Sequence, residues 1–368
     1  GFEDTNFLAG TCAAQPKRWH DAMVKNLEWC FGIDVWMTPT IQACCELFLP
    51  LSTTVEHDTV VYTHYGASPI MAGAVNKSIT VGEGKGDCEI MYEIGKRCMP
   101  ENYERFEDYY DFLEYYRLNN KQTFAELREE VVHQKVETLS YRKYESGKLR
   151  PDGKPGFNTP TGRVELYSTM FRQFGEDPLP YFMEPAMSPY STPDLAEEYP
   201  LVLTTGKRSF EFFHSEHRQL PWCRELWPAP RLEMNPADAE KLGLKQGDWA
   251  WIETEWGKVR QCVDLYHGIA PGWANAEHAW WFPELPAPTH GFTLSNIECI
   301  WDPYGQDTHI SSHHMRGVPV KIYKATPENS PFGNPVPCGD DGTEIIHTCD
   351  DPRLKEWLPD YASERGEA

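Results

Sequence analysis

The residues best suited to chemistry stand together in the stretch GKRSFEFFHSEHRQLP, directly after the strand-like run PLVLTT. Its candidate hydrogen-bonding and small residues are, in order, Gly206, Lys207, Arg208, His214, Ser215, His217, Arg218 and Gln219. Lys, Arg and His side chains supply N–H groups that a phosphate or a polar heterocycle accepts. In an acidic protein, so many donors in one loop indicate a ligand of this kind, and the alternative is a charged surface turn.

Two carboxylates occupy positions where a predicted strand or loop meets a predicted helix. Asp34 ends the run WCFGID and precedes Thr38 at a helix start, and Asp87 opens the helical pattern DCEIMYEIGKRC. A carboxylate at such a position can accept two hydrogen bonds from an amidine-like edge such as that of guanine, and the hydroxyl of Thr38 can add another contact. Each aspartate could equally be an ordinary helix cap. The residues alone leave both interpretations open.

Other chemistries have weaker support. The chain has 11 cysteines but no CxxC pair, so thiols held reduced in the fold are expected rather than a zinc or iron–sulfur site built from this chain. His309, His313 and His314 have a spacing that identifies no further ligand, and no metal site is predicted there. No pair of acidic residues stands out as the acid and base of a glycosidase.

These loops need strands and helices to position them. Residues 1–112 alternate helix and strand patterns, which predicts an α/β domain with a partial parallel sheet. Residues 113–198 predict a helical segment and a Pro- and Gly-rich wrapping linker, and residues 199–325 predict a small β-barrel. Inside the barrel, the run NPADAEKLGL predicts a helix that begins after its cap and ends at a glycine. Residues 326–368 are expected to form a surface extension.

The composition excludes several classes of protein. The 368 residues include 56 Asp and Glu against 34 Lys and Arg, and the net charge of −22 repels phosphate backbones, so no nucleic acid is expected as a partner. Hydrophobic residues make up 40% of the chain, enough for a large core. No apolar run approaches the roughly 18 to 20 residues of a membrane span, and GFEDTNFLAG is unlike a signal peptide.

Several motifs, taken in order, resemble the molybdopterin oxidoreductases of the dimethyl sulfoxide reductase superfamily. They include IDVWMTPTIQACCELFLPLSTTVEHD, GEGKGDCEIMYEIGKR, FNTPTGRVELYS, YPLVLTTGKR and LEMNPADAEKLGLKQGDWAWIETEWGKVRQCV. The runs FHSEHRQLP and PGWANAEHAWWFPE are most similar to the acetylene-hydratase-like branch. The resemblance covers residues 1 to 325 and implies that the predicted barrel is a double-psi-type dinucleotide-binding domain.

The resemblance also implies a cofactor: two pyranopterin guanine dinucleotides around one molybdenum or tungsten. Matched motif by motif, Asp34, Thr38 and Asp87 are expected to hold a guanine and its ribose-phosphate. The residues expected to lie along a pterin are Gly206, Lys207, Arg208, His214 and Ser215, and Asn296 matches an Asn of a later loop of that domain. No catalytic residue is predicted, and Glu46, which replaces the usual Asp in ACCELFLP, is given no role.

The chain also departs from the family pattern, because the four-cysteine motif and the half with the metal-ligating residue are absent. The chain is therefore expected to be the C-terminal part of a longer polypeptide, with a [4Fe–4S] cluster only in the missing N-terminal half. Expected partners are that half, an iron–sulfur electron-transfer subunit, a membrane anchor and a small-molecule substrate, with a lean towards an exported or membrane-associated complex. An oxidoreductase is expected; a non-redox hydratase, a reductive catechol-type dehydroxylase and a non-catalytic binding module remain alternatives.

Overall fold

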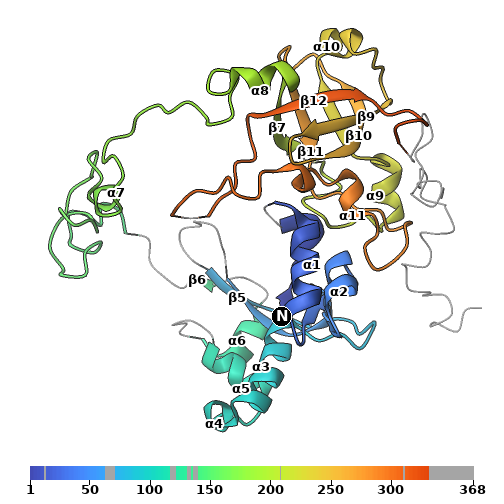
Figure 1. Cartoon of the computed structure of the whole chain (residues 1–368). Coiled ribbons are helices and arrows are strands. Elements are labelled where there is room, and N and C mark those ends of the chain that lie inside the picture. The colour runs from blue at the N-terminus through green and yellow to red at the C-terminus, as the bar shows by residue number, and fades with distance from the viewer. Residues whose placement is uncertain are drawn as a thin grey trace, which may run out of the picture. The chain divides into compact units, whose positions relative to one another are not determined.

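A closed barrel of six strands lies at the centre of the larger of two structural units (Figure 1). The computed structural model describes residues 1–11, 14–62, 71–116, 122–130, 134–135, 140–207, 209–309 and 311–330. The larger unit comprises residues 1–49 and 184–368, and the smaller one comprises residues 50–183. None of the helices in these ranges is long and apolar enough to span a bilayer.

The barrel closes in the order β10-β8-β11-β7-β12-β9. Its strands are β7 (Leu201–Lys207), β8 (Arg231–Met234), β9 (Trp249–Thr254), β10 (Gly257–Leu265), β11 (Trp273–Glu277) and β12 (Val318–Lys324). The β10–β8 and β11–β7 pairs are parallel, whereas β9 pairs antiparallel with both β10 and β12. Closure leaves no strand edge exposed. The predicted barrel is confirmed.

Aliphatic side chains fill this barrel. Leu203, Leu232, Ile252, Val259 and Val320, from five different strands, are each fully buried in one cluster. These side chains alternate with outward-facing ones along each strand, as expected for a barrel interior filled by side chains. A second cluster, rich in aromatic residues, includes Phe212, Trp249, Trp280 and Phe282.

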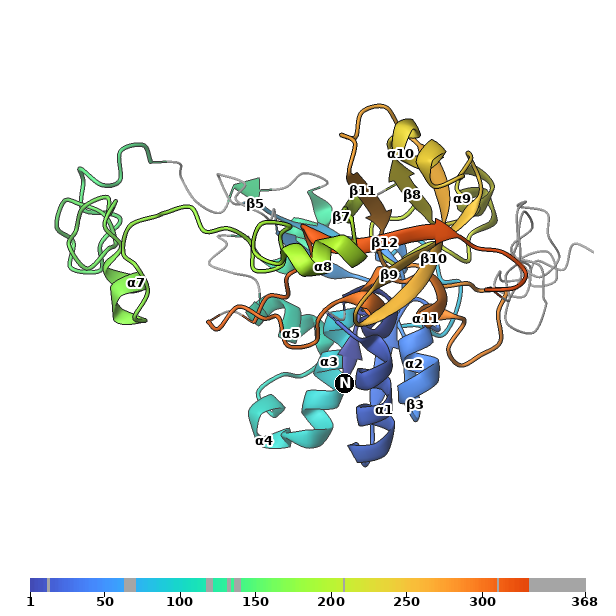
Figure 2. The same cartoon turned by 45° about the horizontal axis from the view of Figure 1, so that its top comes forward.

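The short helices of this region begin with recognisable signals. Helix α10 (Pro236–Lys241) has Asn235 as its N-cap, whose Oδ1 accepts a hydrogen bond from the Ala237 N–H at 3.0 Å, and the predicted helix is confirmed. It lies at one end of the barrel in both cartoon views (Figures 1 and 2). Helices α8 (Pro193–Glu198) and α9 (Pro221–Leu226) and strand β12 were not predicted. Strand β12 was missed because it contains Pro319, which has no N–H to donate and is therefore uncommon inside a strand.

The first 49 residues pack in the same unit as the barrel. They form the sheet β1-β2-β3, of strands β1 (Phe2–Glu3), β2 (Phe31–Asp34) and β3 (Leu47–Pro50), with β1 and β2 parallel. A π-helix, η1 (Phe7–Thr11), and helices α1 (Pro16–Asn26) and α2 (Pro39–Cys44) connect these strands. The strand ending at Asp34 and the helix following Thr38 were both predicted, and the α/β class is confirmed.

Residues 50–183 form the second unit. It contains an antiparallel sheet of β4 (Thr59–Tyr62), β5 (Met71–Val75) and β6 (Gln134–Lys135), preceded by the 3-10 turn η2 (Thr54–Glu56). Its helices are α3 (Asp87–Cys98), α4 (Pro100–Tyr103), α5 (Tyr109–Tyr116), α6 (Phe124–Glu129) and α7 (Thr169–Gln173). The helix opening at Asp87 and the helices after residue 102 are confirmed. Strand β6 was not predicted, because it pairs with β5 through only two residues, too few to leave a periodic pattern.

The unit boundaries differ from the predicted segments. Residues 1–49 group with the barrel, because the N-terminal segment bonds to it: Gln15 Nε2 donates to the carbonyls of Cys299 and Trp301 at 2.9 and 3.0 Å. The two units divide the chain at other positions than the predicted domain limits at residues 112 and 198, and those limits stay predictions. Of the predicted extension at 326–368, residues 331–368 lie outside the described residues.

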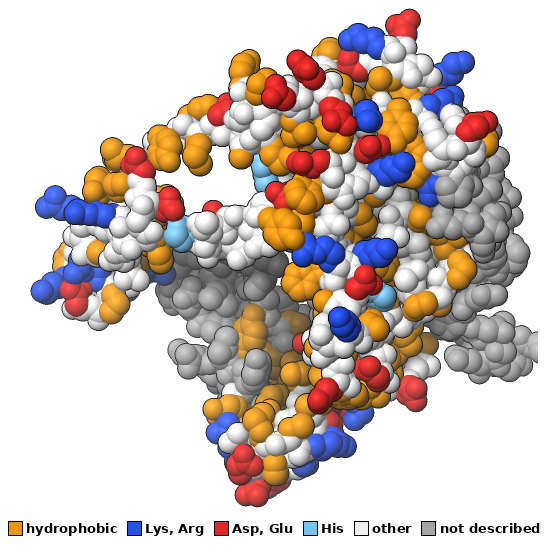
Figure 3. Space-filling model, viewed as in Figure 1, with side chains coloured by type: hydrophobic (Ala, Val, Ile, Leu, Met, Phe, Trp, Pro, Cys, Tyr) orange, Lys and Arg blue, Asp and Glu red, His pale blue; other side chains and the backbone are white. Residues whose placement is uncertain are grey.

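The predicted linker carries large apolar side chains in contact with solvent. Leu166, Phe182 and Tyr190 are 82%, 83% and 88% exposed. Apolar side chains are visible along the segment around α7 in the space-filling view (Figure 3). The Pro- and Gly-rich part of this segment contains only two short helices, α7 and α8, of which α8 was not predicted.

A close approach between α2 and β2 generates the first prediction. A Cβ on Gly32 would lie 2.5 Å from Ile41 Cγ1, so only glycine allows this helix to pack on this strand. We expect Gly32→Ala to lower the free energy of unfolding by about 1–3 kcal/mol through overpacking. The measurement is thermal or denaturant unfolding.

The control is Gly82→Ala, since a Cβ there meets no atom within 4 Å and the stability should hardly change. Adding Ile41→Ala to Gly32→Ala should cost less than the sum of the two single changes. Strict additivity of the two substitutions would contradict the proposed contact.

Candidate functional site

A cavity of about 330 Å³ lies within the larger unit, between the N-terminal segment and the loop after β7. The N-terminal segment contributes Asp4, Asn6, Asp34, Val35, Trp36 and Thr38, and the barrel region contributes His214, Ser215, Glu216, Gln219 and Trp281. The fold thus brings together four residues that the sequence singled out in two distant stretches: Asp34, Thr38, His214 and Ser215. The size of the cavity suits one ring system of a small ligand.

Asp34 sits at the end of β2 and is only 8% exposed. Its Oδ1 accepts a hydrogen bond from the Trp36 N–H at 2.9 Å. Burial raises the pKa of this carboxyl to about 6, and the nearby charges of Asp4 and Glu216 act in the same direction. Ionisation of Asp34 therefore lowers the stability of the folded protein.

Thr38 caps the helix that follows. Its Oγ1 accepts a hydrogen bond from the Ile41 N–H at 3.3 Å, and Pro39 occupies the first position of α2. Thr38, which also lines the cavity, is thus the N-cap of α2, and the helix-cap alternative is wrong for Asp34. It is wrong for Asp87 as well, because Gly86 is the N-cap of α3.

The loop after β7 is organised by a fully buried guanidinium. Arg218 Nη2 donates to the carbonyls of His214 and Ala279 at 2.9 and 3.2 Å, and Nη1 donates to the carbonyl of Glu216 at 3.3 Å. The guanidinium carbon also lies 4.1 Å from the ring centroid of Phe212. Arg218 therefore stabilises the main chain of the loop and does not line the cavity.

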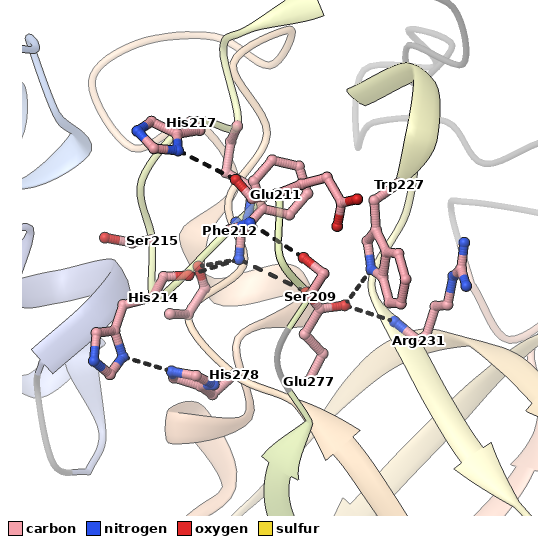
Figure 4. A network of polar contacts seen from close by, with 12 residues as sticks. Ser209, Glu211, Phe212, His214, Ser215, His217, Trp227, Arg231, Glu277 and His278 are labelled. Atoms are coloured by element: carbon pink, nitrogen blue, oxygen red, sulfur yellow. Dashed lines mark hydrogen bonds and ion pairs between the residues drawn. The ribbon is translucent and has the colours of Figure 1, made fainter. Parts of the chain in front are cut away.

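His217 is also used inside the loop. Its Nδ1 lies 3.2 Å from the carbonyl oxygen of Glu211, and its main chain adopts a positive φ of 65° (Figure 4). His217 and Arg218, which were counted among the donors of this loop, therefore bond within the protein and do not line the cavity. The carbonyl groups that Arg218 reaches inside the fold need donors of their own.

His214 and Ser215 remain as groups that line the cavity. His214 Nδ1 lies 2.8 Å from His278 Nε2, so one of the two imidazoles donates to the other (Figure 4). Ser215 is 8% exposed, and its carbonyl accepts a hydrogen bond from Trp281 Nε1 at 2.8 Å. A Cβ on Gly10 would lie 2.7 Å from Ser215 Oγ, so this glycine allows the N-terminal segment to approach the loop.

The other predicted residues lie elsewhere. Gly206, with a φ of 125°, stands near the end of β7; the side chain of Lys207 and the whole of Arg208 lie outside the described residues. Asn296 is fully buried as a cap: its Oδ1 accepts from the Glu298 N–H at 3.2 Å and its Nδ2 donates to the Leu8 carbonyl at 3.4 Å. Asp87 belongs to the second unit, and its Oδ1 is buried without a hydrogen-bond partner. Their roles towards a ligand stay predictions.

Two further polar residues line the cavity: Asn6, which the sequence gave no reason to select, and Gln219, which belongs to the donor-rich loop. Asn6 Nδ2 and Gln219 Oε1 are buried and have no hydrogen-bond partner. Such an atom costs about 1–3 kcal/mol when it stays unpaired. The polar side chains that line the cavity fit one flat heterocycle with polar edges, such as a pterin or a guanine.

The described cysteines form no disulfide. Eight cysteines, Cys30, Cys44, Cys45, Cys88, Cys98, Cys223, Cys262 and Cys299, are free thiols. In the described part of the chain no group of three or more His, Cys, Asp or Glu could hold a metal ion. Glu46 has a structural contact, since its Oε2 accepts from the Cys30 N–H at 2.7 Å.

Comparison with known proteins relates both units to one group of enzymes. Residues 201–304 match the family described as the molydopterin dinucleotide binding domain. A dopamine dehydroxylase of Eggerthella lenta is 54% identical over 222 residues, which are 59% of this chain and 22% of that protein. Acetylene hydratase of Syntrophotalea acetylenica is 33% identical over 310 residues, 82% of this chain and 40% of that protein.

A solved structure agrees with the sequence matches. The acetylene hydratase from Pelobacter acetylenicus superposes with a TM-score of 0.73 at 27% identity, over 85% of this chain and 42% of that one. The chain therefore spans less than half the length of these relatives. Glu216, Gln219 and Trp281 also line the cavity, and they lie in the runs FHSEHRQLP and PGWANAEHAWWFPE that carry the resemblance.

The burial of Asp34 generates the second prediction. Because its pKa in the fold, about 6, exceeds the ordinary 3.8, the folded state binds the proton more tightly than the unfolded state, and this group lowers stability as the pH rises between those values. We expect Asp34→Asn, which keeps an oxygen for the Trp36 N–H, to raise the free energy of unfolding at pH 7 by up to about 3 kcal/mol. Near pH 4 the gain should vanish.

The measurement is chemical denaturation of the ligand-free protein from pH 4 to pH 7.5. Asp177→Asn serves as control, because this aspartate is exposed. In the described residues its side chain only accepts a hydrogen bond, through Oδ1, from the Leu179 N–H. A stability difference for Asp34→Asn that does not vary with pH would show that the buried charge is not its cause.

Proposed function

The chain belongs to the molybdopterin oxidoreductases of the dimethyl sulfoxide reductase superfamily, near the acetylene hydratase branch, and from this membership we propose that it is the C-terminal part of a catalytic subunit. We propose that the full-length protein binds a pair of pyranopterin guanine dinucleotides with one molybdenum or tungsten. The cavity between the N-terminal segment and the loop after β7 holds one ring system of this cofactor.

The residues of this chain have positioning roles in the proposal. Asp34 and Thr38 form one side of the cavity, and His214 and Ser215 form the other. Arg218 keeps the second side rigid through its three carbonyl contacts. When bound, the cofactor supplies electron transfer at its metal to or from the substrate. The walls orient the ring and exclude water from its edges.

For the reaction, we propose reductive removal of a hydroxyl group from a catechol-type aromatic substrate. One observation carries this choice: the 54% identity over 222 residues to a dopamine dehydroxylase, well above the 33% to acetylene hydratase. The aromatic carbon loses its hydroxyl as water and gains a hydrogen, using two electrons and two protons. An iron–sulfur carrier is proposed as the source of the electrons, and a [4Fe–4S] cluster in the N-terminal part of the full-length protein as their entry point.

A hydratase remains the second candidate. The match to acetylene hydratase covers 85% of the chain in structure, more than the 59% covered by the dehydroxylase match. Hydration adds water to a triple bond without net electron transfer, so the two reactions differ in their need for a reductant.

The third prediction concerns cofactor content. The full-length protein should contain molybdenum or tungsten and should release two equivalents of guanosine monophosphate per metal after acid hydrolysis. Asp87→Asn should lower this content about tenfold or more, because a charge-assisted contact to the guanine is replaced by a neutral one. Metal analysis and nucleotide chromatography of the same preparations provide the measurement.

Asp177→Asn is again the matched control and should keep full nucleotide content. If the Asp87→Asn protein keeps its nucleotide content but has a lower melting temperature, Asp87 only stabilises the first turn of α3. A full-length wild type with neither metal nor pterin would refute the proposed function and leave a non-catalytic module.

The fourth prediction concerns the reaction. With reduced methyl viologen as electron donor, the full-length protein should convert a catechol to the corresponding monophenol and oxidise two viologens per product. Mass spectrometry detects the loss of one oxygen, and absorbance follows the viologen. Acetylene hydration without any donor would support the hydratase instead.

A further inference from the structure

Helix α1 is almost entirely exposed in the described part of the chain. Of its 11 residues only Pro16 is buried, while Trp19 and Val24 are 46% and 57% exposed. Met23 packs against a buried apolar cluster of the larger unit, so one side of the helix has a neighbour. The other side has large apolar side chains in contact with solvent. Because an isolated helix of this length is marginal in water, its stability depends on the packing of such side chains.

A stack of aromatic rings continues this exposed surface. The ring centroid of Phe7 lies 5.9 Å from that of Phe2 and 5.5 Å from that of Trp19, so one stack joins β1, η1 and α1. These three elements belong to the larger unit, and α1 lies beside α2 in both cartoon views (Figures 1 and 2). A group of large rings that reaches solvent on one folded unit is typical of a surface that another protein segment covers.

The opposite face of the same sheet also carries aromatic rings. Phe2 pairs with Gly32 in the parallel strands β1 and β2, and side chains alternate between the two faces, so Phe31 points away from the face of Phe2. The ring of Phe31 lies 5.3 Å from that of Trp29, which is 57% exposed. Strand β1 is at an edge of this sheet, and parallel sheets are normally covered on both faces. The aromatic rim of β1 is defined as Phe2, Phe7, Trp19, Trp29 and Phe31.

A second copy of this chain is a poor partner for this surface. The exposed residues Lys17, Arg18 and Lys25 make α1 basic, and Asp21 is its only acidic residue. In a twofold dimer the same surface meets itself, so two basic helices would face each other. Two chains with a net charge of −22 each would also repel one another. The charges therefore favour a different polypeptide segment as the partner.

The length of the relatives indicates which segment this is. The matched part spans 40% of acetylene hydratase and 22% of dopamine dehydroxylase, so more than half of each relative lies outside it. Trp and Phe side chains, together with Arg, are the residues enriched at the centres of protein interfaces.

We propose that the N-terminal part of the full-length polypeptide docks on the aromatic rim and on the outer side of α1, and covers both faces of the sheet at β1. This inference rests on the proposed function, which includes that part, and adds the surface on which it packs. The rings of Trp19 and Trp29, one on each face of the sheet, are its apolar anchors.

Hydroxyl-radical oxidation of the full-length protein, followed by mass spectrometry, tests whether the rim is covered. Each tryptophan is compared with the same residue in a proteolytic digest of the protein. We expect Trp19 and Trp29 to be oxidised about tenfold more slowly in the folded monomer than in the digest, because the centre of an interface is fully buried. Trp273, which is 44% exposed at the start of β11, is the matched control and should stay reactive.

Photo-cross-linking identifies the partner. Trp29→p-benzoylphenylalanine, or the same change at Trp19 where the first variant does not fold, should link on irradiation to peptides from the N-terminal part of the same polypeptide. The mass on a denaturing gel should not increase. The same group in place of Trp273 is the control and should give no such link.

Oxidation of Trp19 and Trp29 as fast as in the digest would overturn the inference. Protection that appears only in a dimer fraction would overturn it too, as would links from position 29 to a second copy, to a separate subunit or to residues 50–183. A full-length protein that contains metal and nucleotide but has a reactive rim would leave the proposed function standing. A protected rim in a protein without metal or pterin would refute the proposed function alone, so the two failures are distinguishable.

Discussion

The buried guanidinium of Arg218 is the interaction on which the cavity depends. Removing a charge from water is costly, and here three main-chain carbonyls, those of His214, Glu216 and Ala279, accept its hydrogen bonds. The rings of Phe212 and Trp280 lie 4.1 and 4.4 Å from it. Because these carbonyls belong to the loop after β7 and to the chain after β11, one side chain ties together the two segments that carry His214 and His278.

A carboxylate close to Arg218, that of Glu277, is itself fixed by other donors. Glu277 Oε1 lies 4.0 Å from Arg218 Nη2, and its Oε2 accepts from Trp227 Nε1 at 2.8 Å and from the Arg231 N–H at 3.2 Å (Figure 4). Its main chain pairs with the carboxamide of Gln261. The cationic group is therefore positioned by strands β8, β10 and β11 of the barrel, which makes the loop a rigid extension of a closed sheet.

The opposite wall of the cavity is positioned by close packing and by main-chain contacts. Gly32 allows α2 to lie against β2, and Gly10 allows η1 to approach Ser215. Gln15 N donates to the carbonyl of Glu298 at 2.8 Å, which joins the N-terminal segment to the barrel region. Asp34, a carboxylate whose burial opposes stability, is part of this wall. A carboxylate that lowers stability in this way is typical of a binding site, where the residue type serves the ligand and not the stability of the fold.

The sequence by itself predicted the barrel, the α/β class and many of the helices and strands, because periodicities and caps such as Asn235 are local properties of the chain. The ordered motifs likewise indicated the family. It missed β6, α8, α9 and β12. It also selected four residues of the cavity. Only the tertiary structure decided which donors face it: His217 and Arg218 carry the same N–H groups as a ligand contact would, yet they satisfy carbonyls of their own loop. The unpaired atoms of Asn6 and Gln219 likewise follow from burial and from partners distant in sequence, which no local pattern encodes.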